Sequence, residues 1–490
     1  MPDSLVVLLP VVVPALGALL HAAAGWNRVT AWTGAVSAAG MLASGIYLAS
    51  EVTGGPALTA GGQLRADALS AFMVIVIGAV ALVAGLTSPA YLAAEIAAGA
   101  ATARTARRHS LLVHGFLTAM ALAVLAANLG TVWVAIEATT IVTAFLVGQR
   151  RTGAALEAAW KYVVICSVGI ALAFLGTVLL SYAAAHGAPG AGLDLSALAA
   201  RAGGLDPDVT RIAVALLVLG FGTKAGLAPL HAWLPDAHSQ APAPVSALMS
   251  GVLLSVAFYA VLRVKVIADA ALGTGFARTL LLTLALATLV VAASLLLAQR
   301  DYKRMLAYSS IEHMGLLALG AAAGSRAAAA GVLLHVLGHG LAKAVLFLGS
   351  GRILQTTRTS LVSGVRGLAT GQPWLAGTFG LGILALVGMP PFSIFASELA
   401  IARAGFADGI GWATAIAFTL LLVIAGALLG RTGSMLLGPP PDPAGVVAHR
   451  LPAGTALPLA AGLLACAALG TTLGPLHDLL TSAAAIVGTP

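Results

Sequence analysis

Residues 219–246 read LGFGTKAGLAPLHAWLPDAHSQAPAPVS, and this stretch decides how the rest of the chain is interpreted. It begins as an apolar helix, carries Lys224 deep within the apolar run, and then breaks up in Gly and Pro. An ordinary membrane-spanning helix avoids both features, because lipid offers no partner for a freed backbone group or for an ammonium. Their occurrence together predicts a broken helix that is built around an ionisable group.

The composition of the whole chain is typical of a polytopic helical membrane protein. Of its 490 residues, 60% are hydrophobic and 9% are charged, and the mean hydropathy is +1.00. These values exclude a soluble domain. The net charge of +8 does not indicate a nucleic-acid partner, because the basic residues lie in short loops between apolar runs. Cys166 and Cys466 lie far apart and have neither metal-ligand nor disulfide spacing.

Apolar runs long enough to cross a bilayer predict an all-α integral membrane protein with about 14 transmembrane helices. The first run follows MPDSLVVLLP, which has no basic segment, so we expect a span here and not a cleaved signal. The predicted spans are residues 4–24, 29–50, 67–89, 110–127, 130–148, 157–184, 209–229, 244–262, 277–298, 305–323, 328–350, 373–398, 410–430 and 455–474.

The distribution of basic residues predicts the orientation of the chain. Of the 25 Lys and Arg residues, 14 fall in connections on one side and 8 on the other, while Lys161, Lys224 and Lys343 remain within spans. Because Lys and Arg collect on the cytoplasmic side, we expect a multi-pass protein of the inner (plasma) membrane with both termini on the outer side.

Three ionisable residues of the first half are candidate site residues. A lysine within a span costs roughly 2.5–3.5 kcal/mol unless it meets a partner or water. Lys224 lies deep in its span, whereas Lys161 lies near a helix start, where the alternative is an interface anchor beside Trp160 and Tyr162. Glu137 lies in the middle of NLGTVWVAIEATTIVTAFLVG. A carboxylate at this depth is by default a functional group, and the alternative is a protonated structural Glu.

Two histidines follow the break in the seventh span. His231 and His238 flank Pro235 and Asp236. They are interpreted either as helix-end hydrogen-bonding groups or as a proton relay, since histidine titrates near neutral pH. We expect no metal site here, because no third and fourth ligand stand at suitable spacing.

A polar stripe is predicted in the second half. Glu312 and His313 lie two turns into the tenth span, and His335, His339 and Lys343 recur at i, i+4 and i+8 in GVLLHVLGHGLAKAVLFLGSG. That spacing places the last three side chains on one helix face. Such a stripe must face protein or water, which predicts a chain of titratable groups, the alternative being a purely structural stripe.

The twelfth span repeats the pattern of the seventh. LGILALVGMPPFSIFASELAIA is broken at residues 388–391, and Glu398 follows the break. Paired broken spans predict two inverted five-helix repeats with discontinuous helices 7 and 12. The expected divisions are N-terminal helices in 1–108, repeats in 109–266 and 267–437, and a Pro-rich loop with the last helix in 438–490.

Several segments resemble one family of membrane proteins. WVAIEATTIVTAFLVG, ALEAAWKYVVICSVG, TKAGLAPLHAWLPDAHSQAP, RMLAYSSIEHMG, HGLAKAVLFLGSG and GMPPFSIFASE are similar to the antiporter-like proton-pumping subunits shared by NADH:quinone oxidoreductase, multisubunit Na+/H+ antiporters and membrane-bound hydrogenases. The resemblance covers roughly residues 67–430. Within that family, the IEH and PPF…SE segments are most similar to component F of hydrogenase-4 and formate hydrogenlyase assemblies.

The resemblance implies roles for individual residues. Glu137 and Lys224 match a pair thought to gate protonation, the stripe from His335 to Lys343 matches a central connection, and Glu398 matches a terminal group. In one departure, Ser255 stands in the eighth span, where some relatives have a lysine. Because the chain ends soon after its last span, the long lateral C-terminal helix of one subunit type is not expected.

The function that we expect is proton translocation by one membrane subunit of a larger redox complex. The resemblance implies other membrane subunits and a soluble redox arm as partners, with no redox centre, cofactor or metal in this chain. A path rich in His and Lys favours protons, although Na+ stays open. The alternatives are a Na+/H+ antiporter subunit, a proton-pumping subunit of NADH:quinone oxidoreductase, and a non-conducting scaffold for a soluble hydrogenase arm.

Overall fold

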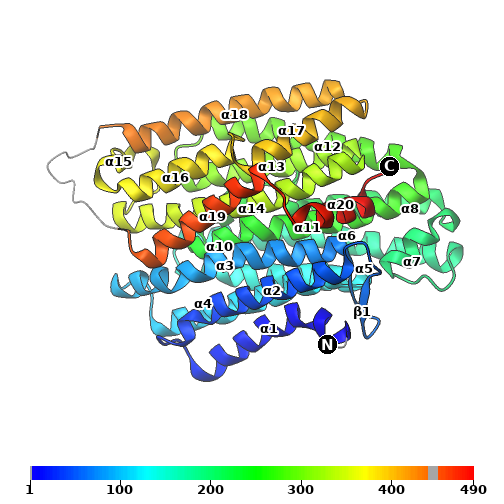
Figure 1. Cartoon of the computed structure of the whole chain (residues 1–490), viewed down its shortest axis with the longest axis horizontal. Coiled ribbons are helices and arrows are strands. Elements are labelled where there is room, and N and C mark those ends of the chain that lie inside the picture. Colours follow the sequence, from blue (N-terminus) through cyan, green and yellow to red (C-terminus); the bar gives the residue numbers. More distant parts are fainter. Residues whose placement is uncertain (1–2, 440–450, 490) are drawn as a thin grey trace.

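The chain folds into a bundle of roughly parallel and antiparallel helices (Figure 1). The structure is a computed structural model and describes residues 3–439 and 451–489. Within those residues, 11 helices are long and apolar enough to cross a membrane, and Pro373–Leu386 and Leu476–Val487 are shorter apolar helices. The predicted all-α membrane architecture is confirmed, whereas the count of 14 spans and the inverted repeats stay predictions.

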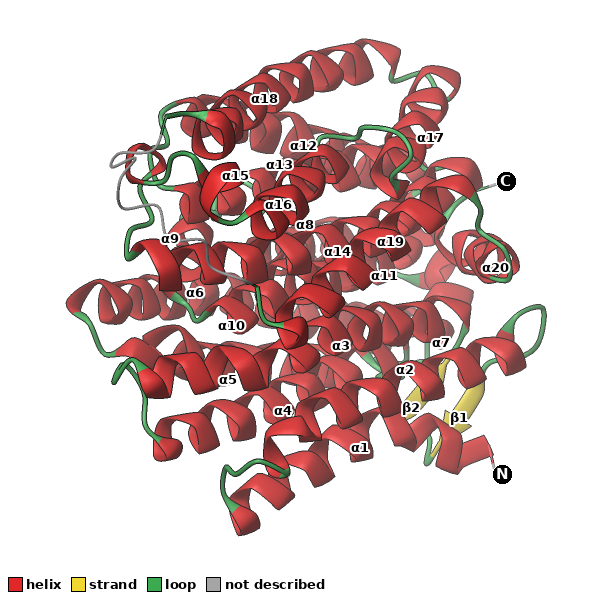
Figure 2. Cartoon of the chain, turned by 60° about the vertical axis from the view of Figure 1, so that its left-hand side comes forward, coloured by secondary structure: helices red, strands yellow, loops and turns green. Residues whose placement is uncertain are grey.

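The N-terminal layer holds four long helices and one small hairpin that the sequence did not predict. Asp67 caps α3 by accepting a hydrogen bond from the Ser70 amide, and Thr102 caps α4. The hairpin of β1 and β2 connects α2 to α3 (Figure 2). The elements are α1 (Asp3–Ala24), α2 (Thr33–Val52), β1 (Leu58–Ala60), β2 (Leu64–Ala66), α3 (Ala68–Ala97) and α4 (Ala103–Leu125).

The next group of helices contains the first predicted break. α8 ends at Ala225, because Gly226 adopts a left-handed φ of 83° that suits glycine, and the helix resumes as α9. A π-helical turn, Met249–Leu253, precedes α11. The elements are α5 (Leu129–Val147), α6 (Gly153–Gly187), α7 (Leu195–Ala200), α8 (Pro207–Ala225), α9 (Trp233–Gln240), α10 (Ala243–Leu248) and α11 (Leu254–Leu272).

The last group contains the second predicted break. α16 gives way to α17 around Gly388, whose φ is +67°, and Pro391 follows three residues later, as Pro229 follows Gly226. The elements are α12 (Thr274–Leu297), α13 (Tyr302–Ala323), α14 (Arg326–Thr357), α15 (Leu368–Gly371), α16 (Pro373–Leu386), α17 (Ser393–Ala407), α18 (Gly411–Leu437), α19 (Ala453–Thr471) and α20 (Leu476–Val487). Both breaks are therefore confirmed. α20 was not predicted, and the predicted Pro-rich loop lies largely in residues 440–450, outside the described residues.

The centre of the bundle is formed by α14 and by the run from α10 to α11, both entirely buried over their most apolar stretch. Gly340 of α14 and Gly251 of the π turn let the two backbones approach, since a Cβ on either residue would come within 2.9 Å of the other's carbonyl oxygen. The polar stripe of α14 thus lies at the core and not against lipid. Both termini lie at the same end of the bundle (Figure 1).

Candidate functional site

Lys224 lies fully buried at the C-terminal end of α8. Its ammonium donates hydrogen bonds to the hydroxyl of Tyr162 at 2.7 Å and to Oγ1 of Thr140 at 3.0 Å. The Tyr162 ring lies 4.8 Å from the same nitrogen, which adds a cation–π contact. Neutral oxygen acceptors and an aromatic face therefore surround this lysine.

Glu137 does not pair with Lys224 in the structure, contrary to our prediction. In the part of the chain that the structure describes, no ion pair joins the two residues, and Oε2 of Glu137 is buried without a hydrogen-bond partner. The physical reason is that two polar residues share the face of α5 that lies toward Lys224. Glu137 and Thr140 are three residues apart and so neighbour each other on the helix, and the hydroxyl of Thr140 takes the place at Lys224.

Lys161 lies at the surface of α6, apart from the buried lysine. It pairs with Glu157 at 2.6 Å and with Asp236 of α9 at 3.1 Å, and 46% of its side chain is exposed. Arg304 of α13 contacts the other oxygen of Asp236 at 2.8 Å. This arrangement ties α9 to its two neighbours. In the alternative interpretation of Lys161 as an interface anchor, Tyr162 would lie beside it, but the Tyr162 side chain is buried and contacts Lys224.

His238 lies in a row of tilted and edge-to-face ring contacts that runs from Tyr162 to Phe347. The Tyr162 and Trp233 ring centroids are 4.9 Å apart, those of Trp233 and His238 are 5.9 Å apart, and those of His238 and Phe347 of α14 are 5.7 Å apart. Nδ1 of His238 donates to the Leu234 carbonyl at 2.9 Å, and its buried Nε2 has no partner among the described residues.

His231 is only partly buried and lies in the break before α9. Its Nδ1 also has no hydrogen-bond partner within the described part of the chain. The structure therefore separates the two histidines that flank Pro235, since only His238 reaches the core.

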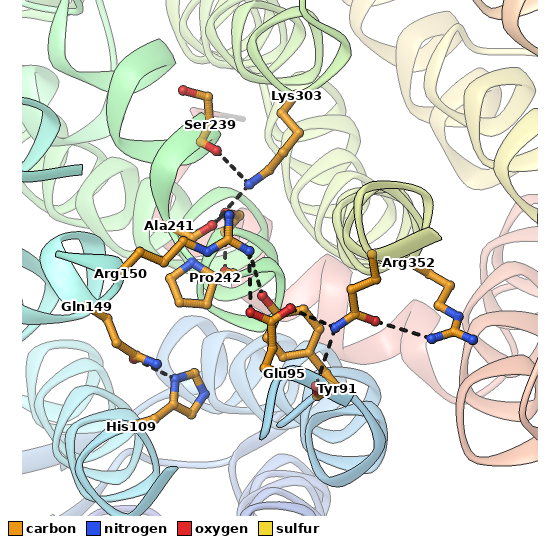
Figure 3. Close-up of polar contacts among 12 residues, drawn as sticks. Tyr91, Glu95, His109, Gln149, Arg150, Ser239, Ala241, Pro242, Lys303 and Arg352 are labelled. Carbon is orange, nitrogen blue, oxygen red and sulfur yellow. Dashed lines mark hydrogen bonds and ion pairs between the residues drawn. The ribbon is translucent and has the colours of Figure 1, made fainter. Parts of the chain in front are cut away.

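A second polar cluster lies at the C-terminal end of α9 (Figure 3). The fully buried ammonium of Lys303 donates to the carbonyls of Ser239 at 2.6 Å and Ala241 at 3.0 Å. Ser239 lies in the last turn of α9 and Ala241 directly follows it, where a helix leaves acceptors unsatisfied. Beside them, Arg150 donates to the Tyr91 hydroxyl at 3.1 Å and lies 3.9 Å from a Glu95 oxygen. Lys303 stands before the predicted span 305–323, whereas the structure places it inside α13.

Lys343 lies at the C-terminal end of the buried stripe of α14. It donates to the Leu306 carbonyl at 2.7 Å and to Oγ of Ser309 at 2.5 Å, both on α13. The side chain is fully buried. As with Lys224, its partners are neutral oxygens.

Two of the three buried histidines of the second half, His313 and His335, form an ordered hydrogen-bond chain with Ser397. Ser397 donates to the Ile394 carbonyl, so its oxygen accepts from Nδ1 of His335 at 2.9 Å. In neutral rings this fixes Nε2 of His335 as the acceptor for Nδ1 of His313, at 3.0 Å. Nε2 of His313 is then the free acceptor, and it lies 3.9 Å from Oε2 of Glu312.

His339 lies beside this chain. Its ring centroid is 4.9 Å from that of His313 and 6.4 Å from that of His335, and neither of its nitrogens has a partner among the described residues. The helix therefore brings His335, His339 and Lys343 onto one buried face, as their spacing predicted.

Glu312 and Glu398 share a small cavity of about 80 Å³ with Phe418 and Leu422 of α18. The carboxylate of Glu398 lies directly against Gly388 at the second break. A Cβ added to Gly388 would overlap this carboxylate. Among the described residues, no three His, Cys, Asp or Glu side chains are grouped as metal ligands. Lys343, the histidines and the two carboxyl groups can each bind and release a proton.

Comparisons with known proteins identify the family of the chain. Residues 126–424 match the family described as NADH:quinone oxidoreductase/Mrp antiporter, TM. The chain is a member of this family. A hydrogenase-4 component F homolog from Methylacidiphilum infernorum is 39% identical over 337 residues, which cover 68% of this chain and 70% of that protein. The predicted resemblance is confirmed.

Two solved structures share the fold of this antiporter-like chain. A chain of the archaeal membrane-bound sulfane sulfur reductase superposes with a TM-score of 0.84 at 23% identity, covering 99% of this chain and 97% of the other. A chain of the Mrp complex from Dietzia sp. gives a TM-score of 0.85 at 21% identity, covering 99% and 98%.

The structure also shows functional candidates that sequence patterns missed in this antiporter-like chain. Ser250 of the π turn is 2.8 Å from the hydroxyl of Ser310 on α13, next to the serine that binds Lys343. Ser255, where some relatives have a lysine, is buried, and its hydroxyl has no partner among the described residues. The contact between the eighth and tenth spans is therefore made at Ser250. A π turn inside an α-helix is frequent at functional sites, but no residue pattern announces it.

Proposed function

We propose that this chain conducts protons as one membrane subunit of a multisubunit redox complex of the hydrogenase-4 or formate hydrogenlyase type. The observation that carries the proposal is the buried row of titratable side chains from Lys224 through His238 to Lys343 and the histidines beyond it. Ionisable groups at membrane depth are costly, and they are retained where ions or protons move. Family membership supports the multisubunit setting.

The proposed path has two ends and a crossing. Lys224 and its hydroxyl partners form the first end, and the Glu312 and Glu398 cavity forms the second. His238 is the crossing, because its ring lies between Trp233 on one side and Phe347, one turn from Lys343, on the other. The unpartnered nitrogens of His238 and His339 are where a proton or a bridging water is accommodated.

The switch that we propose for Lys224 differs from a fixed ion pair. In the structure the ammonium binds Thr140, one turn from Glu137 on α5. If the Lys224 ammonium moved by one turn along α5, its partner would change from the Thr140 hydroxyl to the Glu137 carboxylate. Movement between the two partners would then couple the redox module to proton release from Lys224.

Protons are favoured over Na+ as the transported ion, because the buried row is made of Lys and His nitrogens, which titrate and do not suit a hard cation. We further propose a plasma-membrane location with both termini on the outer side. Support comes from the shared end of the two termini and from the excess of Lys and Arg in the opposite connections. Lys161 is then a positioning residue that holds α9 through Asp236.

The test is to reconstitute the assembled complex in vesicles and to measure proton movement per redox turnover in Lys224→Ala and Glu137→Gln. Both substitutions should abolish the share of translocation that passes through this subunit. Unchanged translocation in both variants would overturn the proposal in favour of a non-conducting scaffold. Transport that requires Na+ in the buffer would favour the antiporter alternative.

A further inference from the structure

A large cavity lies between α4, α5 and α6, at the end of the bundle opposite the termini. Its volume is about 790 Å³. The row of buried titratable groups described above does not reach it. Its lining combines guanidinium groups at the helix ends with apolar side chains further along the helices, and we call it the arginine pocket. Its charged members are Arg104, Arg108, Arg150 and Arg151.

Three of these arginines have no acidic partner. Arg104, Arg108 and Arg151 are exposed, and in the described residues no ion pair involves any of them. Arg151 is also one of two described non-glycine residues with a positive φ, here 54°. Such backbone costs free energy and is often retained at binding sites.

Arg150 and Gln149 of the lining are turned toward the protein. Arg150 is directed to Tyr91 and Glu95, and Gln149 to Nδ1 of His109 at 2.9 Å (Figure 3). These contacts fix the inner wall. The neighbouring carboxylate of Glu157 forms an ion pair with Lys161 at 2.6 Å, so it does not offset the positive charge of the pocket arginines.

The apolar part of the pocket continues along the membrane-facing surface. Phe145 of α5 and Leu156 and Trp160 of α6 line it, and they are 58%, 49% and 69% exposed. Leu112 of α4 and Val163 of α6 complete the wall. An exposed tryptophan beside arginines is typical of the level where lipid headgroups meet acyl chains.

We propose that the arginine pocket binds an anionic phospholipid. The phosphate lies among Arg104, Arg108 and Arg151, and an acyl chain follows Phe145 and Trp160. Guanidinium groups bind phosphate through charge-assisted, often paired, hydrogen bonds. A free phosphate would leave the apolar wall uncovered, and an acidic peptide would match only the rim. A lipid matches both, and basic pockets between helices are known lipid sites.

Trp160 provides a local reporter for the test. The full chain, purified with the subunits that accompany it, is placed in phosphatidylcholine nanodiscs. Phosphatidylglycerol or phosphatidylcholine with brominated acyl chains is then added. Bromine quenches nearby tryptophans, and the part of the quenching that Trp160→Phe removes belongs to the pocket. We expect the pocket to prefer phosphatidylglycerol roughly 100-fold, at about fivefold for each of the three arginines.

The arginine variants decide whether the site is specific. Each arginine near an anionic headgroup contributes roughly fivefold to binding, so Arg104→Gln/Arg108→Gln should weaken the preference about 25-fold. The matched control, Arg28→Gln/Arg300→Gln, removes the same charge from exposed loops at the same end and should leave it unchanged. Equal loss in both pairs would overturn the proposal, because surface potential alone would explain the preference.

Two further results would also overturn it. If glycerol phosphate displaces the brominated lipid at equal concentration, the pocket is a phosphate site and not a lipid site. If neither lipid quenches Trp160 in the intact assembly, a neighbouring subunit covers the pocket. Retention of phosphatidylglycerol by the wild-type assembly in native mass spectrometry, lost in the Arg104/Arg108 variant, would support the site independently of Trp160.

Discussion

Replacing His238 by phenylalanine should stop proton conduction and leave the bundle intact. The imidazole lies fully buried between Trp233 and Phe347, with ring centroids 5.9 and 5.7 Å away. Phenylalanine has a similar shape, so it keeps these contacts and creates no cavity. It removes both nitrogens, including the buried Nε2, which has no hydrogen-bond partner among the described residues.

The structural cost of this change is small compared with its expected effect on conduction. The hydrogen bond lost is the one from Nδ1 to the Leu234 carbonyl at 2.9 Å, worth about 1 kcal/mol. Against a folding free energy on the order of 5–15 kcal/mol, that loss leaves the amount of assembled complex unchanged. A positioned proton-transfer group contributes about a hundredfold or more in rate, or about 2.7 kcal/mol.

The assay is proton movement per redox turnover in vesicles, at an assembly level measured on native gels. His186→Phe is the matched control. His186 makes the same type of bond, from Nδ1 to the Tyr182 carbonyl at 2.9 Å, and contacts the Tyr182 ring, but it lies exposed at the end of α6. We expect loss of conduction in His238→Phe and none in His186→Phe. Full conduction by a correctly assembled His238→Phe complex would refute the crossing at His238.

Two further predictions concern other parts of the bundle. Gly388→Ala should displace the Glu398 carboxylate and cost roughly 1–2 kcal/mol from its left-handed φ, lowering both thermal stability and conduction. Asp67→Asn should remove the 2.6 Å pair with Arg263 and destabilise the fold by about 3–5 kcal/mol at neutral pH, while Asn still caps α3. Burial raises the pKa of Asp67, but the Arg263 guanidinium outweighs this effect and holds the pKa below its usual 3.8. The stabilisation is therefore present above pH 3.8 and is lost as pH falls through the lowered value.

Thermal unfolding in detergent checks both predictions. Gly377→Ala is the control for Gly388, because a Cβ there meets nothing within 4 Å. Asp206→Asn is the control for Asp67, because Asp206 caps α8 from an exposed position through the amides of Asp208 and Val209. A wild-type stability advantage over Asp67→Asn that grows as the pH falls below 3.8 would contradict the assigned ion pair. Normal stability and conduction in Gly388→Ala would contradict the placement of Glu398.

The features that followed from the sequence are those set by local rules. The stripe of His335, His339 and Lys343 follows from helical periodicity, which holds wherever the helix is placed. The two breaks follow from Gly and Pro that stand three residues apart, whereas a single proline such as Pro89 lies inside a continuous helix. The membrane class follows from composition.

The features that did not follow depend on how helices rotate against one another. Glu137 and Thr140 lie on the same face of α5, so helical periodicity does not distinguish which of them contacts Lys224. The position of α5 relative to α8 decides it. Lys303 has the sequence context of a loop lysine, but α9 ends beside it and supplies two carbonyls. The contact of Ser250 with Ser310 depends on a π turn that residue preferences do not specify.

The most direct test of the central claim is the proton yield of Lys343→Met in the assembled complex. Lys343 lies where the crossing meets the histidine chain, and its partners are an uncharged carbonyl and a hydroxyl, so methionine leaves no buried charge behind. The control is Lys265→Met/Asp269→Asn, which removes a second largely buried lysine together with its partner at 2.6 Å. We predict that only Lys343→Met loses the protons translocated per redox turnover by this subunit. An unchanged yield in assembled Lys343→Met would contradict the account.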